Sequence, residues 1–298
     1  MTTRTSSPHS ALPAGAVTTT IVAWDRSAPS RAALAWALGR TSTNAVHLLH
    51  VLDRTQASAE YFIADATVTQ AKNDFLEEAD RVRRQNPALR ITAEFVLGDP
   101  ITVLRALSTP ETLIVVGTHA RDGATARYEW SVGARLAGSS PGPVAIIPET
   151  SSEGGAGIVV GVDGSAASTA ALVFAAHEAS RTGEPLRAIH AWQEPLVWRD
   201  TAAPDPTFLK ALEQVHRETL TTAISSVSKD FPGLVITPEL VRGAPQWTLL
   251  DAARNAALVV VGNHGLYGIR RQLLGVVSHS IVLNIQSPTV VVNSDSDS

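Results

Sequence analysis

Several glycines follow an apolar run near the end of the chain, in the sequence VVVGNHGLYGIRRQLLGVVSHS. Gly262 ends the apolar run, and Gly265 and Gly275 follow it. Glycine has no Cβ, so a ligand can approach its backbone closely. A loop that leaves a strand and enters a helix also offers N–H groups and the positive end of the helix dipole to a phosphate. The pattern predicts a phosphate cradle; a long turn is the alternative.

Catalytic groups are not evident around this loop. Arg270 and Arg271 could meet phosphate charge, or could simply be solvated. The P-loop pattern G-x4-G-K-[ST] does not occur in the sequence, which excludes that class of ATPase. No residue of the cradle is an evident base or nucleophile, and the two histidines that bracket the loop, His264 and His279, are more often structural. We therefore expect a binding protein and not an enzyme.

Length and composition limit the possible functions. A chain of 298 residues is long enough for two domains, and 44% hydrophobic with 17% charged residues is typical of a globular protein. No apolar run reaches the roughly 20 residues that span a bilayer. A net charge of −4 and the lack of a basic run argue against nucleic acid as a partner. Without a secretory signal at the N-terminus, we expect the protein in the cytoplasm.

The chain repeats one pattern twice. Asp25 in "IVAWDRS" corresponds to Asp163 in "IVVGVDGS", an offset of 138. Three later pairs share an offset of 145: Gly98 and Gly243, Gly117 and Gly262, Pro143 and Pro288. A Ser/Gly-rich stretch separates the copies and reads as a linker. We therefore predict two domains, at 18–148 and 157–293.

Each copy alternates strands and helices. In the second copy, strands are expected at 158–162, 186–192, 235–241, 258–261 and 289–292. Helices are expected at 166–181, with Ser165 as its N-cap, and around 207–230, 244–255 and 273–285. This order predicts an α/β fold in which each domain has a five-stranded parallel sheet. Such sheets bind ligands at the carboxyl ends of their strands.

An Asp after the first strand and G-x2-G-x9-G after the fourth resemble the universal stress protein family, over nearly the whole chain and twice. The resemblance implies tandem Rossmann-like domains of the adenine nucleotide α-hydrolase-like type. It also implies an adenine nucleotide as ligand, ATP with or without Mg²⁺, and a role as a nucleotide-dependent sensor or regulator. Slow ATP hydrolysis remains open.

The same resemblance assigns roles to residues of the second domain. Asp163 would hold the adenine or ribose end, although it could instead cap the following helix. The main chain at Ala191 would read the adenine, and Gly161 would line the ribose side. The phosphates would lie on Gly262, Gly265, Gly275 and the amide of Val276.

Both copies depart from the family pattern. Val276 stands where a Ser or Thr hydroxyl would bond a phosphate, which predicts affinity weakened by roughly 10- to 100-fold. Ser278 is a candidate to compensate. In the first copy, Ala120 and Trp130 replace the second and third glycines, so we expect ATP binding mainly in the second domain.

Two rival functions follow from these departures. If both sites have decayed, the protein would be an interaction module that binds no nucleotide. A phosphoryl or nucleotidyl transferase would need a catalytic acid, a lysine or metal carboxylates near the cradle, and none is visible in the sequence.

The fifth strand of each domain, which begins at Pro143 or Pro288, is apolar and needs cover. The resemblance implies pairing through this strand, because dimers of the universal stress protein family commonly pair there. We expect the two strands to pair within one chain as an intramolecular pseudo-dimer. We also expect two chains to form a homodimer.

Overall fold

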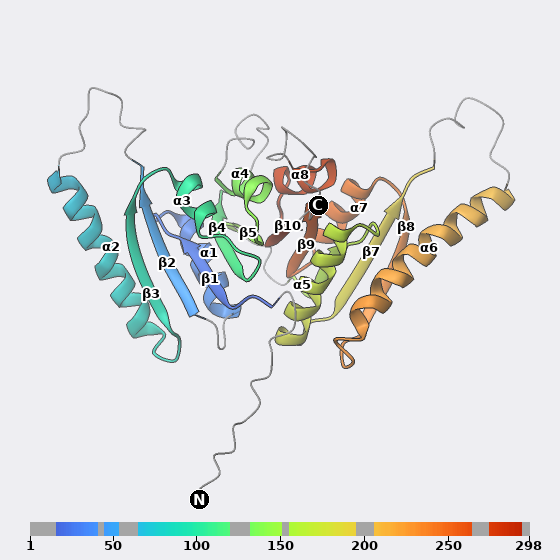
Figure 1. Cartoon of the computed structure of the whole chain (residues 1–298), viewed down its shortest axis with the longest axis horizontal. Coiled ribbons are helices and arrows are strands. Elements are labelled where there is room, and N and C mark those ends of the chain that lie inside the picture. Colours follow the sequence, from blue (N-terminus) through green and yellow to red (C-terminus); the bar gives the residue numbers. More distant parts are fainter. Residues whose placement is uncertain are drawn as a thin grey trace, which may run out of the picture.

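The computed structural model describes residues 16–40, 45–53, 65–119, 132–150, 155–194, 206–263 and 274–293. Over these ranges the chain forms two similar halves that lie side by side (Figure 1). Among the described residues, no helix is both long enough and apolar enough to cross a membrane.

Each half contains five strands and four helices. The first half comprises β1 (Thr19–Ala23), α1 (Ala28–Arg40), β2 (Ala45–Leu52), α2 (Asp65–Gln85), β3 (Ile91–Leu97), α3 (Pro100–Ala106), β4 (Thr112–Thr118), α4 (Val132–Ser139) and β5 (Val144–Pro148). The second half comprises β6 (Ile158–Gly161), α5 (Ala166–Thr182), β7 (Leu186–Trp192), α6 (Pro206–Ser228), β8 (Ile236–Arg242), α7 (Pro245–Ala253), β9 (Leu258–Asn263), α8 (Val276–Leu283) and β10 (Thr289–Asn293).

These elements confirm the predicted α/β alternation, with two differences at the cradle. The strand expected to end at Val261 continues to Asn263, so Gly262 lies within β9. The helix expected from 273 begins at Val276.

All ten strands join one sheet in the order β3-β2-β1-β4-β5-β10-β9-β6-β7-β8. Neighbouring strands are parallel except at the centre, where β10 pairs antiparallel with β5 and Val291 lies opposite Val144. The expected pairing of the fifth strands within one chain is therefore confirmed. The homodimer remains a prediction.

Buried apolar side chains cover both faces of the sheet. On one face, α1, α2, α5 and α6 pack against the strands, and on the other face α3, α4, α7 and α8 do so. Each of these two cores includes residues of both halves. The central strands are nearly uninterrupted runs of β-branched residues because both of their faces are buried.

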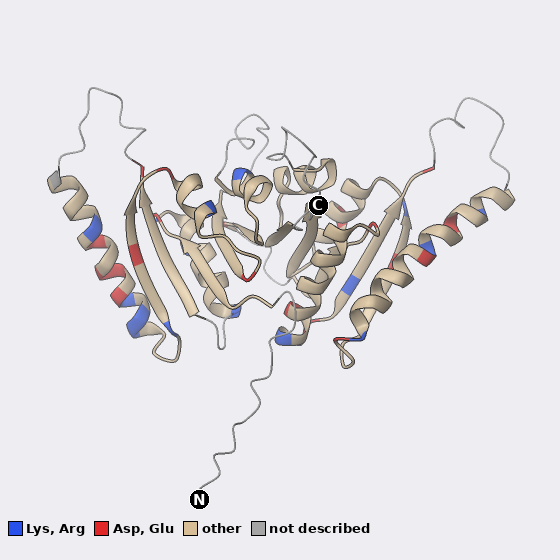
Figure 2. Ribbon diagram, viewed as in Figure 1, with Lys and Arg blue, Asp and Glu red and all other residues tan. Residues whose placement is uncertain are grey.

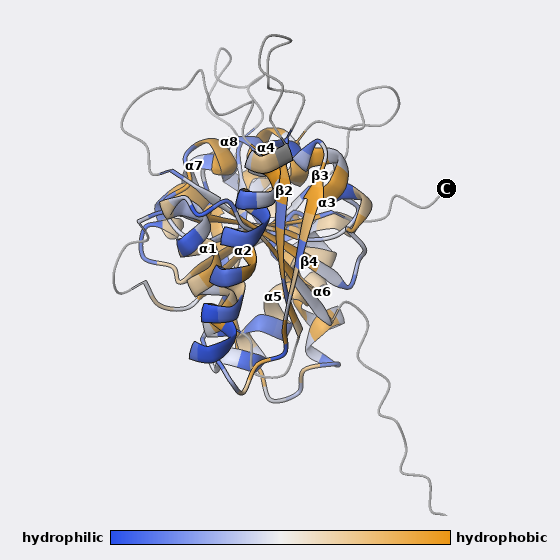
Figure 3. Cartoon of the chain, turned by 90° about the vertical axis from the view of Figure 1, so that its left-hand side faces the viewer, coloured by the Kyte–Doolittle hydropathy of each residue, from blue (hydrophilic) through white to orange (hydrophobic). Residues whose placement is uncertain are grey.

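Charge is concentrated on the outside of the molecule. Lys, Arg, Asp and Glu colour the outer helices α2 and α6, whereas the central strands carry few charges (Figure 2). Seen from its side, α2 is largely hydrophilic (Figure 3). The edge strand β8 and its neighbour β7 also carry charges, and Arg187 on β7 forms a partly exposed ion pair with Glu239 on β8. Charged side chains are typical of strands at the margin of a sheet.

Candidate functional site

The carboxyl ends of the parallel strands gather five of the predicted site residues at one edge of the second domain. Gly161 ends β6 and lies opposite Ile189 of β7, and Asp163 follows two residues later. Ala191 is the penultimate residue of β7, and Gly262 lies near the end of β9. Gly275 directly precedes α8. Predicted residues that fall outside the described ranges are Gly265, Arg270, Arg271, Ala120 and Trp130.

The turn after β6 is built by hydrogen bonds between neighbouring residues. The Asp163 carboxylate accepts a hydrogen bond from the amide of Ser165, at 3.0 Å. Ser165 is the N-cap of α5, as predicted, and its hydroxyl oxygen accepts from the amide of Ser168 at 3.1 Å. Asp163 therefore does not cap α5 itself; it holds the capping residue in place. Asp163 is exposed, just beyond the carboxyl end of β6.

Gly262 is required by packing. A Cβ at this position would lie 2.5 Å from the carbonyl carbon and oxygen of Ala167, in the first turn of α5. Gly117 has the same relation to α1, with the carbonyl oxygen of Pro29 only 2.1 Å from an added Cβ. The close approach of a helix thus accounts for this glycine in both domains, whether or not a phosphate binds there.

Gly275 has no such packing reason. A Cβ there would meet no atom of the described residues within 4 Å, and any residue can adopt its backbone conformation (φ −61°, ψ 158°). Gly275 is the N-cap of α8 and supplies no side-chain cap hydrogen bond. The N–H groups at the start of α8 have no partner inside the helix, as in any helix. Of the glycines described in the predicted cradle, only Gly275 leaves room beside an uncapped helix start.

A path of hydrogen bonds leads from Gly275 to the first domain. The Gly275 amide donates to Oδ1 of Asn263 at 3.0 Å, and Nδ2 of Asn263 donates to Oδ1 of Asn293 at 2.8 Å. Nδ2 of Asn293 then donates to the carbonyl oxygen of Ala137 in α4, at 3.1 Å. The sequence analysis missed both asparagines, although each stands at the end of an apolar strand, where an uncharged polar residue is conspicuous.

The residues after Gly275 do not restore the missing hydroxyl. The Val276 side chain is 78% exposed at the first position of α8. Ser278 is buried, and its hydroxyl donates to the carbonyl oxygen of Gly262 at 2.7 Å. Because a hydroxyl has one proton, Ser278 cannot also donate to a phosphate. The suggestion that Ser278 compensates is therefore wrong.

Beside Ala191, two histidines form a chain that the sequence analysis also missed. Nδ1 of His190 lies 2.7 Å from the carbonyl oxygen of Val162, and its Nε2 lies 2.8 Å from Nδ1 of His216 on α6. The Trp192 ring stacks on His216 with centroids 4.9 Å apart. Burial, followed by the neighbouring His190, lowers the pKa of His216. His216 lies four residues before buried Leu220, a helical spacing that could have placed it on the inner face.

The first domain reproduces part of this edge. The Asp25 carboxylate accepts from the Ser27 amide at 2.9 Å, and Nδ1 of His50 lies 2.7 Å from the carbonyl oxygen of Trp24. Burial by itself opposes the charge on Asp25, but hydrogen bonds from Ser27 hold the pKa of Asp25 below its usual value. Burial also lowers the pKa of His50, whose ring stacks on Phe95 at 5.2 Å. The strand ends are thus alike in the two domains.

Comparison with known proteins agrees with this architecture. The sequence model of the universal stress protein family matches residues 17–148 and 157–293. A universal stress protein of Mycobacterium tuberculosis is 32% identical over 254 residues, which is 80% of this chain and 75% of the relative. One from Mycolicibacterium smegmatis is 28% identical over 285 residues, 91% of this chain and 96% of the relative. The crystal structure of a universal stress protein from Archaeoglobus fulgidus superposes with a TM-score of 0.67 at 18% identity, covering 93% of this chain and 98% of that one.

Proposed function

Because the chain belongs to the universal stress protein family, with two such domains in tandem, we propose that it binds an adenine nucleotide, ATP, mainly in its second domain. In this proposal the bound nucleotide makes the protein a cytoplasmic sensor or regulator, and the chain is not an enzyme. Mg²⁺, where it accompanies ATP, would arrive with the phosphates.

The observation that carries the proposal is the open space at Gly275. Neither packing against the described residues nor backbone conformation requires a glycine there. Glycine is a suitable N-cap residue, and because it has no side chain it also lets a ligand approach the start of α8 closely. The Gly275 amide is already bonded to Asn263. A phosphate would therefore use the next amides of α8, starting with that of Val276, and the positive end of the helix dipole.

The hydrogen-bond path through Asn263 and Asn293 supports a regulatory role. A phosphate on the amides that follow Gly275 would lie beside the Gly275–Asn263 hydrogen bond, and Asn263 is bonded to Asn293, the residue that contacts Ala137 in the first domain. Binding at the cradle would in this way alter the hydrogen bonds at the contact between the domains. Within the described part of the chain, no three His, Cys, Asp or Glu residues come together as a metal site, and the proposal needs none.

Calorimetric titration with ATP tests the proposal. Wild-type protein should bind, whereas Gly275→Leu should weaken binding by more than roughly 10-fold, because the side chain would fill the space beside the first amides of α8. Gly233→Leu is the matched control: an added Cβ there also meets nothing within 4 Å, but it lies before β8, at the opposite end of the sheet. Equal ATP affinity in wild type and Gly275→Leu would remove Gly275 from the site.

The exposed Val276 favours a second candidate, a protein-interaction module without nucleotide. An apolar side chain stands where a hydroxyl would serve a phosphate, and Ser278 does not replace that hydroxyl. This candidate predicts that the purified protein carries no nucleotide and gives no binding heat with millimolar ATP. Saturable heat with wild type that Gly275→Leu abolishes would reject it.

A further inference from the structure

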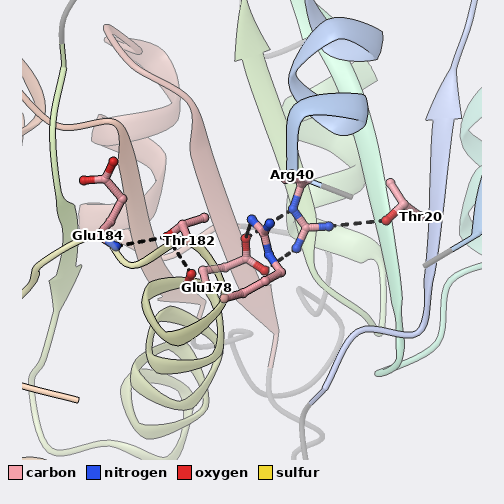
Figure 4. Close-up of polar contacts among 6 residues, drawn as sticks. Thr20, Arg40, Glu178, Thr182 and Glu184 are labelled. Atoms are coloured by element: carbon pink, nitrogen blue, oxygen red, sulfur yellow. Dashed lines mark hydrogen bonds and ion pairs between the residues drawn. The ribbon is translucent and has the colours of Figure 1, made fainter. Parts of the chain in front are cut away.

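A buried ion pair joins the two domains. Arg40 ends α1 of the first domain, Glu178 lies on α5 of the second, and only 7% and 5% of their surfaces are exposed. Nη2 of Arg40 donates to Oε1 of Glu178, and Nε donates to Oε2 at 3.2 Å (Figure 4). Nη1 of Arg40 also donates to Thr20 at 3.3 Å, and Arg181 donates to Glu178 at 2.9 Å. The pair is thus fully buried and supported from both sides.

Arg40 and Glu178 occupy equivalent positions in the two domains. Around the first helix of each domain the offset is 138: Asp25 and Asp163 each accept a hydrogen bond from the amide two residues later. The same offset relates Arg40 to Glu178. The antiparallel β5–β10 pairing relates the domains by an approximate twofold axis, so each of these residues meets its own counterpart across that axis. Identical domains paired in this way would place two like charges together.

The surface through which each domain contacts the other includes its fifth strand (β5 or β10) and the end of its first helix (α1 or α5); we call it the fifth-strand face. We infer that Arg40 and Glu178 make the fifth-strand face of each domain selective for the opposite domain. Two first domains would bury Arg against Arg, and two second domains would bury Glu against Glu. Removing one partner of a buried pair leaves an uncompensated charge, and a like charge in its place is worse. This face therefore accepts a second domain against a first and excludes identical pairing, so any homodimer of the chain uses another surface.

A second contact across the same face has the same asymmetry. Asn293 of β10 donates its amide to the carbonyl oxygen of Ala137 in α4, at 3.1 Å. By the offset of 145, the counterpart of Asn293 in the first domain is Pro148, whose side chain has no donor. Two first domains could not form this bond either.

Charge reversal in the full chain tests the inference. Arg40→Glu and Glu178→Arg should each lower the urea midpoint and increase the radius of gyration measured by small-angle scattering. The double variant Arg40→Glu with Glu178→Arg should recover at least half of both losses. Glu178→Arg should be the more damaging single change, because it places a third cation beside Arg40 and Arg181, whereas Arg40→Glu leaves Arg181 to pair with the carboxylates.

The matched control is the pair Arg187 and Glu239, which joins β7 to β8 inside one domain and is partly exposed. Reversing either of these charges should leave the radius of gyration unchanged. The inference would be overturned if Arg40→Glu and Glu178→Arg both kept the wild-type urea midpoint and radius of gyration. It would also be overturned if the double variant had a urea midpoint and a radius of gyration no closer to wild type than those of the worse single variant.

Mixing the two single variants tests selection directly, including where a single variant fails to fold alone. The Arg40→Glu chain carries only carboxylates at the two positions, and the Glu178→Arg chain carries only guanidinium groups. When the two are unfolded together in urea and then refolded, the first domain of either chain can therefore pair with the second domain of the other through opposite charges. Native mass spectrometry should then detect oligomers that contain both chains, with each variant alone forming at least tenfold less oligomer. A mixture that behaves as the sum of its separate components would refute selection between domains.

Discussion

A single methyl group at Gly262 should destabilise the second domain. Gly262 lies in β9 beneath the start of α5, and an added Cβ would lie 2.5 Å from two backbone atoms of Ala167 and 2.8 Å from the nitrogen of Ser168. Backbone atoms cannot rotate aside as a side chain can. The first turn of α5 is also held by the Ser165 cap. To accept Gly262→Ala, the helix must move away from the sheet.

The size of the effect follows from these distances. Restoring an ordinary contact requires α5 to retreat by roughly 1 Å in a close-packed interior, and overpacking of this kind costs about 1–3 kcal/mol. Gly275→Ala is the matched comparison, because its Cβ meets nothing within 4 Å and its φ of −61° suits alanine. We expect the loss of a glycine N-cap and the stiffer unfolded chain nearly to cancel there, leaving a change below about 1 kcal/mol.

Urea unfolding followed by circular dichroism measures both variants. With an m-value of about 1–3 kcal/mol per M, Gly262→Ala should lower the urea midpoint by roughly 1 M while Gly275→Ala stays near wild type. ATP titration of the same proteins should show the reverse order, with the weaker binding in Gly275→Ala. A wild-type urea midpoint for Gly262→Ala would refute the packing explanation of that glycine. If both variants lowered the midpoint equally, the distinction between a packed Gly262 and an unpacked Gly275 would be refuted.

Three further predictions concern the cradle and the contact between domains. Val276→Ser should tighten ATP binding by roughly 10-fold in calorimetry, since a hydrogen bond to a charged group is worth about 1.5–3 kcal/mol; an unchanged affinity would mean that the backbone already satisfies the phosphate. Ser278→Ala should cost about 1 kcal/mol in urea unfolding, because the carbonyl of Gly262 loses its 2.7 Å hydroxyl donor; no loss would show that this bond contributes nothing net. Burial alone would raise the pKa of Glu178, but the charge of Arg40 holds that pKa below 4.5. The stabilisation is therefore complete above pH 4.5 and is lost as the pH falls through the folded pKa; scattering at decreasing pH should show the domains separating there, and Glu178→Gln should abolish that transition.

The alternation of strands and helices could be predicted because it depends on patterns local to the chain. Runs such as LVVVGN and TVVVN are apolar on both faces, as strands buried between two helix layers must be. Ser165 at the start of α5 is equally local, because a cap bonds an amide three residues away. The pairing of β5 with β10 could be predicted from the family resemblance, which implies pairing through the fifth strand, together with the need of two apolar strands on one tethered chain for cover.

The purpose of each cradle glycine could not be predicted, because it depends on what lies nearby in space. Gly262 and Gly275 look alike in the sequence, yet one lies under a helix and the other beside open space. Ser278 likewise looked available to a ligand until its hydroxyl was found bonded to Gly262. Such distinctions need the distance between segments far apart in the chain, which spacing along one segment does not contain.

The pair of Arg40 and Glu178 falls between these cases. The repeat offset of 138 already aligned the two positions, and opposite charges at equivalent places of a duplicated domain are a signal that a sequence carries. The sequence could not reveal that these positions meet, or that both side chains are buried. Because the domain is duplicated within one chain, the two copies can carry opposite charges at equivalent positions and so recognise each other. Two identical subunits related by a twofold axis cannot do this at a position that meets itself across the axis.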